Sequence, residues 1–179
     1  MRITGGLYKG RIIKMPKGEI RPAMDRMRES MFSILGSLEG KRFLDVFSGS
    51  GCVGIEAASR GAVNVDLVEK DRIKRSVILE NISIVECPIK LIMMPAERFL
   101  KFAKGQWDVI HLDPPFPYKY KLDLLKTIAS KDLVTPGGYL MMHYPGEESY
   151  PETIGLYNRV DFREYGRSHL IFYQRSVSE

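Results

Sequence analysis

The stretch that decides the predicted fold is Leu44-Asp45-Val46-Phe47-Ser48-Gly49-Ser50-Gly51-Cys52-Val53-Gly54. Its glycines form a G-x-G-x-x-G pattern between an apolar strand and the start of a helix. In open α/β sheets, such a turn brings backbone N–H groups close to a bound nucleotide. Glu69 lies 20 residues past Gly49, at the end of the next predicted strand, where a carboxylate can accept hydrogen bonds from ribose hydroxyls. The pattern predicts a nucleotide site, and it fits a dinucleotide and S-adenosylmethionine equally well.

Asp45 favours S-adenosylmethionine over a dinucleotide. Its carboxylate stands before the glycines at the end of a strand, where it would repel a pyrophosphate but attract a cationic amino acid group. A plain tight turn at the glycines and a solvated strand end at Glu69 are the alternatives. We therefore expect S-adenosylmethionine as the cofactor, with contacts from Asp45, Phe47, Ser48, Gly49, Ser50, Gly51, Glu69 and Lys70.

From residue 42 onward, predicted strands and helices alternate along the chain. Repeated strand–helix units imply a parallel sheet with helices on both faces. A short turn at Gly166 joins the last two strands, which are therefore antiparallel. The predicted fold is α/β, a Rossmann-like class I methyltransferase with a seven-stranded, mostly parallel sheet whose last strand is antiparallel. The expected strands are 42–47, 63–68, 89–94, 107–112, 139–143, 157–164 and 169–175, and the expected helices are 24–38, 53–60, about 72–85, 96–103 and 122–130.

Residues 1–22 are predicted to form an extension in front of the methyltransferase domain, residues 23–179. Two short strands, 2–4 and 10–15, flank a Gly-rich turn and predict a β-hairpin. Residues 1–42 hold ten Lys and Arg against four Asp and Glu, a net charge of +6, whereas the rest of the chain carries −1. This asymmetry indicates polyanion binding, although a solvated basic face would have the same composition.

The turn Asp113-Pro114-Pro115-Phe116 follows the fourth predicted strand, at the edge where open α/β sheets bind ligands. Two prolines remove two N–H donors, so the turn presents rigid acceptors, namely the Asp113 side chain and a nearby carbonyl. These acceptors can bind both N–H groups of an exocyclic amino group and aim its lone pair at an activated methyl group. Phe116 offers a face for base stacking. The turn predicts methyl transfer to an amino nitrogen of a nucleobase, with all four residues as the catalytic set.

Composition argues against several other classes of protein. No apolar run approaches the roughly 20 residues that a membrane helix needs, and the N-terminus has no apolar signal-peptide core, so we expect a cytoplasmic protein. The two cysteines form no C-x-x-C pair, and with only three histidines no metal site is expected. His111 lies inside a predicted strand and is expected in the core, whereas His143 ends a strand near the cofactor edge.

A wider pattern spans nearly the whole chain. It comprises Arg2-Ile3-Thr4-Gly5-Gly6 with Gly10-Arg11, the block Arg21-Pro22-Ala23-Met24-Asp25-Arg26-Met27-Arg28-Glu29-Ser30-Met31-Phe32, the glycine stretch with Glu56-Ala57 and Ser59-Arg60-Gly61, then Glu69-Lys70-Asp71 and the turn at 113–116. This pattern resembles the RsmD-like family of bacterial 16S ribosomal RNA guanine-N2 methyltransferases. The block at 21–32 is the part most specific to that family, because other amino methyltransferases share the turn.

The resemblance implies methylation of N2 of an unpaired or flipped guanine in 16S rRNA, during assembly of the 30S subunit. It also implies RNA contacts from the N-terminal extension and the helix after it, by Lys9, Arg11, Arg21, Arg26 and Arg28. We expect the protein to act as a monomer without a membrane or metal partner. Relatives usually carry Asp or Asn after the third strand to bind adenine. This chain has Pro95 there, so that contact would pass to backbone at Ala96 or to Glu97.

Three alternative functions remain open from the sequence. An adenine-N6 methyltransferase of DNA or RNA would share the turn, but reading a DNA sequence needs insertions for which 179 residues leave little room. An NAD-dependent oxidoreductase would account for the G-x-G-x-x-G pattern. A non-catalytic RNA-binding or assembly factor could use the same fold.

Overall fold

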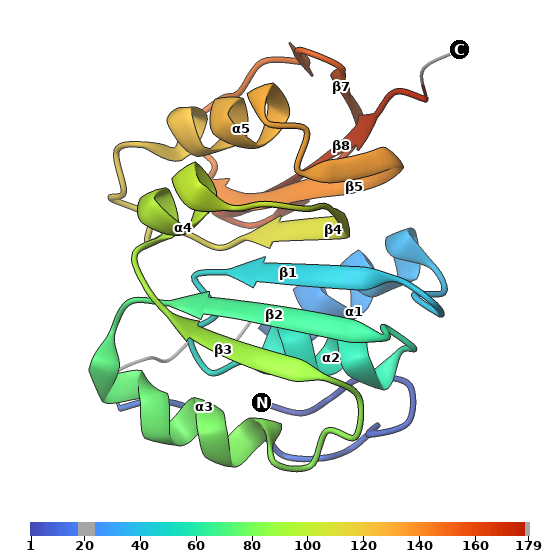
Figure 1. The fold of residues 1–179 in the computed structure, drawn as a ribbon, viewed down its shortest axis with the longest axis vertical. Helices are drawn as coiled ribbons and strands as arrows, with labels where there is room; N and C mark the ends of the chain where they lie inside the picture. Colours follow the sequence, from blue (N-terminus) through green and yellow to red (C-terminus); the bar gives the residue numbers. More distant parts are fainter. Residues whose placement is uncertain (18–23, 178–179) are drawn as a thin grey trace.

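The computed structural model describes residues 1–17 and 24–177, and its centre is one mixed sheet (Figure 1). In these residues the sheet has eight strands in the order β3-β2-β1-β4-β5-β8-β7-β6. Strands β1 to β5 are parallel, and β8 lies antiparallel between β5 and β7. The bounds are β1 (Arg42–Val46), β2 (Asn64–Glu69), β3 (Ile89–Met93), β4 (Trp107–Leu112), β5 (Val134–Pro145), β6 (Thr153–Ile154), β7 (Tyr157–Tyr165) and β8 (Ser168–Arg175).

The predicted fold class is confirmed, with one more strand than the seven expected. The additional strand is β6, whose two residues pair with Asn158 and Tyr157 at the edge of the sheet. A two-residue strand has too short a pattern to stand out in the sequence. Strand β5 also begins at Val134, five residues before the predicted 139, because it runs through Gly137 and Gly138. The β4–β5 register shifts there, because Trp107 pairs with Val134 and Val109 pairs with Tyr139, so the extra residues lie on β5.

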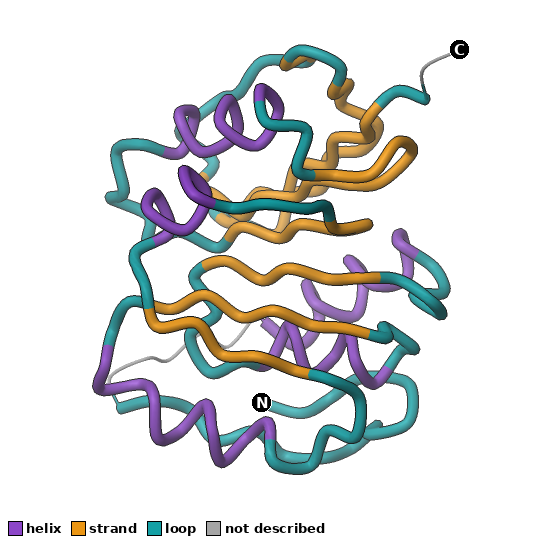
Figure 2. The backbone as a smooth tube through the Cα atoms, in the orientation of Figure 1, coloured by secondary structure: helices purple, strands orange, loops and turns teal. Residues whose placement is uncertain are grey.

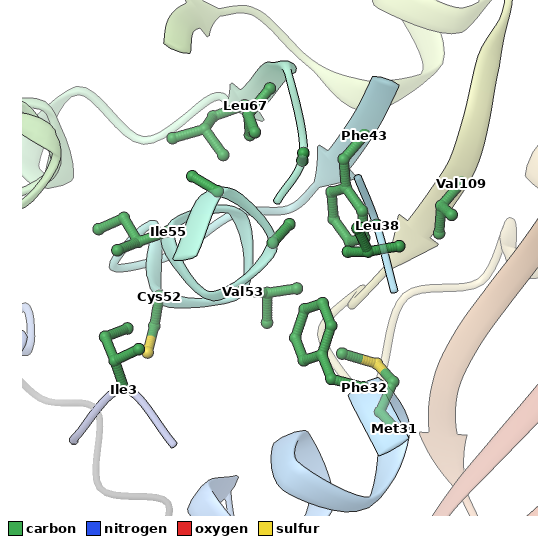
Figure 3. Close-up of a cluster of buried hydrophobic side chains, with 14 of the residues drawn as sticks. Ile3, Met31, Phe32, Leu38, Phe43, Cys52, Val53, Ile55, Leu67 and Val109 are labelled. Atoms are coloured by element: carbon green, nitrogen blue, oxygen red, sulfur yellow. The ribbon is translucent and has the colours of Figure 1, made fainter. Parts of the chain in front are cut away.

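Helices cover both faces of the sheet (Figure 2). They are α1 (Met24–Leu35), α2 (Cys52–Ser59), α3 (Arg75–Ile82), α4 (Ala96–Phe102) and α5 (Lys121–Ser130), with a 3₁₀ turn at Arg72–Lys74 before α3. Alternate strand residues serve the two faces, as the pleat requires. Phe43 of β1 joins the cluster under α1, α2 and α3, whereas its neighbour Leu44 joins the cluster under α4 and α5. Figure 3 shows part of the first cluster, with Phe32 of α1 beside Phe43.

The N-terminal segment, residues 1–17, is mostly loop and turn, so the two predicted strands are shorter than expected. One antiparallel bridge joins Arg2 to Ile12, and the Ile3 N–H donates to the Arg11 carbonyl at 3.0 Å. The segment packs on α2 because Ile3, Tyr8 and Ile13 are buried in the same cluster as that helix. Residues 1–17 therefore pack into the same hydrophobic cluster as the sheet. The role of residues 1–22 as an RNA-binding extension stays a prediction.

No helix among the described residues is long and apolar enough to span a bilayer.

Candidate active site

A hollow of about 260 Å³ opens at the carboxyl ends of β1, β2 and β4. It brings together segments that are far apart in the sequence, because neighbouring parallel strands end at the same edge. Its lining combines the predicted cofactor contacts with the predicted catalytic turn. The lining residues are Met1, Met15, Phe47, Ser48, Gly49, Ser50, Cys52, Val53, Glu69, Lys70, Asp71, Lys74, Asp113 and Pro115.

The glycine loop, residues 47–51, has an unusual backbone. Gly49 and Gly51 have φ of 57° and 83°, in the left-handed region that favours glycine. Phe47 also has a positive φ, 63°, which costs a non-glycine residue about 1–3 kcal/mol and is found mostly at functional sites. A Cβ on Gly54 would stand 2.3 Å from Cδ2 of Leu67, so this glycine allows α2 to pack closely on β2. The three glycines therefore meet the geometric demands that the sequence pattern predicted.

Glu69 closes the loop from the neighbouring strand. Its Oε1 accepts from the Gly49 N–H at 3.0 Å, and its Oε2 accepts from the Asp71 N–H at 2.9 Å. The side chain is 8% exposed and lines the hollow. Each carboxylate oxygen has a second lone pair, so Glu69 can still accept from hydroxyl groups of a ligand.

Asp45 does not line the hollow, although it was predicted to contact the cofactor. Its side chain is fully buried behind the loop, and its Oδ1 lies 2.9 Å from Nδ1 of His111. Burial raises the pKa of Asp45, and the negative charges of Asp113 and Glu69 raise it further. Oδ2 of Asp45 is buried and has no hydrogen-bond partner among residues 1–17 and 24–177. Three carboxyl groups thus converge at this sheet edge, and their negative charge would favour a cationic ligand.

The target turn, Asp113-Pro114-Pro115-Phe116, is held by hydrogen bonds at both ends. The Asp113 N–H donates to the Val46 carbonyl at 3.1 Å, which fixes the turn beside β1. The Pro115 carbonyl accepts from Tyr118 N–H, and the Phe116 carbonyl accepts from Nζ of Lys121 at 2.6 Å. The prediction of carbonyls without competing donors is therefore wrong for these two positions. Asp113 and Pro115 of this turn line the hollow.

Sequence reasoning missed Lys121, which begins α5 with a side chain only 2% exposed. Its Nζ donates to the carbonyls of Phe116 and Tyr118, at 2.6 and 2.9 Å, and lies 3.1 Å from the Glu148 carboxylate. The Tyr150 hydroxyl donates to the same carboxylate at 2.6 Å. This lysine fixes the backbone after the target turn. Its partner Glu148 is 27 residues away in the chain, so no local pattern could reveal the pair.

Arg28 was predicted to bind RNA, and the structure contradicts this. The side chain is 1% exposed, and its Nε donates to Oε1 of Glu56 on α2 at 3.0 Å. It also contacts the Arg2 carbonyl and, at 3.0 Å, Asp25. Arg28 therefore has a structural role, because the N-terminal segment covers the side of α1 that would otherwise face solvent.

The other predicted RNA contacts have different outcomes. Lys9 and Arg11 are exposed on the N-terminal segment and Arg26 is exposed on α1, so all three are accessible to a polyanion. Arg21 lies outside the described residues. Their contact with RNA stays a prediction.

Ala96 and Glu97 do not line the hollow beside the glycine loop. Ala96 is 4% exposed in the core under α4. The Glu97 carboxylate accepts from the Tyr118 hydroxyl at 3.0 Å and lines a second hollow of about 280 Å³, together with residues of α5. The expected adenine contacts at these two positions are therefore not supported by the geometry.

Known proteins that are similar to this chain carry the names of methyltransferases, which agrees with the predicted type of site. The family model described as conserved hypothetical protein 95 matches residues 1–174. The chain belongs to this family. A Bacillus subtilis relative, "Putative rRNA methyltransferase YlbH", is 31% identical over 182 residues, covering 98% of this chain and 99% of the relative. A Haemophilus influenzae relative, "Ribosomal RNA small subunit methyltransferase D", is 29% identical, covering 78% and 76% of the two chains.

A solved structure of the family's fold confirms the predicted architecture. "Putative methyltransferase yhhF from Escherichia coli" superposes with a TM-score of 0.88 at 25% identity, covering 99% of each chain. The family membership and this fold confirm the resemblance to the RsmD-like methyltransferases that the motifs indicated.

Proposed function

We propose that this protein is an S-adenosylmethionine-dependent methyltransferase that modifies the exocyclic N2 of a guanine in small-subunit ribosomal RNA. The observation that carries the proposal is the single hollow lined by the glycine loop, by Glu69 and by the target turn. A methyl donor held by the first two would lie next to a base held by the third. The names of the relatives, which refer to rRNA, support RNA as the substrate.

The residues around the hollow fit a cationic nucleoside. Glu69 would bind ribose hydroxyls and the glycine loop would pack against the amino acid end of the ligand, whereas Asp45 is buried behind the loop and does not contact the hollow. When bound, S-adenosylmethionine supplies an activated methyl group on a sulfonium. The chain then has mainly to align the acceptor nitrogen with that methyl group.

Asp113 and the carbonyl of Pro114 are the acceptors for the amino N–H groups of the base. They hold the nitrogen in place and stabilise the positive charge that develops on it during transfer. Phe116 is half-buried beside them and offers its ring to the base. Because the methylated nitrogen loses its proton readily, no dedicated general base is required.

The test is to incubate the protein with labelled S-adenosylmethionine and 30S subunits that lack the modification, and to analyse the rRNA nucleosides by mass spectrometry. We expect label in N2-methylguanosine. The Asp113→Ala variant should lose transfer yet still bind S-adenosylhomocysteine in calorimetry. Asp123→Ala, at an exposed acid on α5, is the matched control and should transfer at the wild-type rate.

Other outcomes would favour the alternatives. Label in N6-methyladenosine would show that the target base is adenine and not guanine. Binding of NADH in place of S-adenosylhomocysteine would indicate an oxidoreductase. Full function of Asp113→Ala in cells would indicate a non-catalytic assembly factor.

A further inference from the structure

His143 of β5 stands next to the target turn. In the β4–β5 register, Leu112 pairs with Met142, so Asp113, just after β4, lies beside His143, which is still within β5. Nδ1 of His143 lies 2.8 Å from Oδ1 of Asp113. The histidine side chain is 2% exposed and the aspartate side chain 13%. This hydrogen bond is therefore largely shielded from solvent, and its acceptor is the carboxylate that the proposed reaction uses.

The same imidazole also contacts the aromatic side chain of the turn. The rings of Phe116 and His143 meet edge to face, with centroids 5.3 Å apart and planes at 70°. One residue thus touches both the proposed acceptor carboxylate and the proposed stacking surface. Side chains held by packing and by a hydrogen bond keep a catalytic group within the narrow range of positions that transfer requires.

The surroundings of Nε2 decide the tautomer. This atom is buried and has no hydrogen-bond partner among the described residues. A proton on Nε2 would be a buried donor without an acceptor, which is costly, whereas a proton on Nδ1 has the Asp113 oxygen to donate to. The geometry therefore favours the imidazole with its proton on Nδ1, donating to Asp113 and leaving that residue an acceptor.

We propose that His143 is a positioning residue for methyl transfer, which acts by donating from Nδ1 to Oδ1 of Asp113 and by bracing the Phe116 ring. The inference rests on the proposed function, because it assigns His143 a role in that reaction. It predicts that losing the donor slows the methyl-transfer step while leaving cofactor binding intact.

Three variants separate the two contacts from a general role in folding. His143→Phe keeps a ring beside Phe116 but removes the donor to Asp113. His143→Asn places an amide N–H close to the position of Nδ1 but removes the ring. His169→Phe is the matched control, because His169 of β8 packs on Tyr144 and Phe162, away from the turn.

We expect kcat to fall about 10- to 100-fold in His143→Phe, the loss expected when a hydrogen bond to a charged group is removed. KM for S-adenosylmethionine should stay within about twofold, because ground-state binding of the cofactor is untouched. His143→Asn should recover part of the lost kcat, because it restores the donor to Asp113 but not the ring beside Phe116, and His169→Phe should match the wild type. Nitrogen-15 NMR of the imidazoles should show His143 protonated at Nδ1, with a signal that changes in Asp113→Ala.

The outcomes distinguish this inference from the function on which it rests. Transfer is counted as label in total rRNA, so it does not depend on which nucleoside receives the methyl group. If the wild type transfers methyl groups and His143→Phe is equally fast, or if His143 carries its proton on Nε2, the positioning role is wrong while the proposed function stands. If the wild type transfers no label to rRNA, the proposed function fails, and this inference fails with it.

Discussion

Replacing Arg28 by Met should destabilise the fold without weakening RNA binding by the folded protein. Arg28 joins three parts of the chain: α1, which carries it, Glu56 of α2, and the backbone of the N-terminal segment at Arg2. Glu56 is fully buried and also accepts from Arg60 and from the backbone N–H groups of Thr4 and Gly5. Met has a similar length but cannot donate, so the variant leaves a buried carboxylate with fewer partners.

The size of the effect follows from what Glu56 retains. Removing one partner of a buried ion pair costs about 3–5 kcal/mol. Since Arg60 still lies 3.0 Å from the carboxylate, we expect the lower end of that range, about 3 kcal/mol. For a chain of this size the melting temperature should fall by roughly 6–12 °C.

Acid should reduce the difference between wild type and variant. Burial alone would raise the pKa of Glu56, but hydrogen bonds from Thr4, Arg28 and Arg60 outweigh it and hold the pKa below its usual value of 4.5. The stability that Glu56 contributes is therefore present above pH 4.5 and is lost as the pH falls through the lower, folded-state pKa. Without Arg28, that pKa lies closer to 4.5, so the variant has less of this stability to lose and the two proteins approach each other as the pH falls.

The assay compares Arg28→Met with Arg26→Met, two residues away on the same helix and exposed. Thermal unfolding is followed by circular dichroism, and affinity for a 16S rRNA fragment is measured at several salt concentrations. Arg26→Met should melt within about 1 °C of the wild type, as exposed substitutions usually do. If Arg26 contacts phosphate, the slope of log affinity against log salt concentration should decrease in magnitude by about one in Arg26→Met. A wild-type melting temperature in Arg28→Met, combined with weakened RNA binding, would refute the reasoning.

Three further predictions concern the N-terminal segment, the target turn and the buried Asp45–His111 pair. Gly6→Ala should lower the free energy of unfolding in urea by more than about 2 kcal/mol, because its Cβ would stand 1.9 Å from a backbone oxygen of α2; Gly10→Ala, with a similar φ but open space, should lose only about 1 kcal/mol. Lys121→Met should slow single-turnover methyl transfer and lower stability by about 1–3 kcal/mol, since two buried carbonyls lose their donor; unchanged transfer would contradict its positioning role. Although burial opposes the charged form of His111, the hydrogen bond to Asp45 holds its pKa above 6.5, so this contribution to stability is present below pH 6.5 and is lost as pH rises through the folded-state pKa. The stability difference between wild type and His111→Gln should therefore shrink with rising pH in denaturant titrations, and a constant difference would contradict this account.

The sequence predicted the parts of the site that depend on local pattern and topology. The glycine loop, Glu69 and the target turn were expected to converge, because each follows a strand and parallel strand ends share one edge. Arg28 was assigned to RNA from the family resemblance, and its local sequence does not indicate that its side chain is buried. What buries it is Glu56, 28 residues away, together with a loop whose path no periodicity encodes.

Long-range side-chain pairs account for most of what could not be predicted. Asp45 and His111 are 66 residues apart and pair across adjacent strands, so neither position signals the other. The same holds for Asp113 and His143, 30 residues apart. Glu97 likewise pairs with Tyr118, 21 residues further along the chain.

All eight residues of α2 are buried, which has a consequence for how this protein could evolve or be re-engineered. The helix that opens at the glycine loop has the sheet on one side and residues 1–17 on the other. Removing or transplanting that N-terminal segment, as one might do with an independent RNA-binding module, would expose the outer side of α2, the helix that begins at the cofactor site. The basic segment and the catalytic fold must therefore be inherited, exchanged and redesigned as one unit.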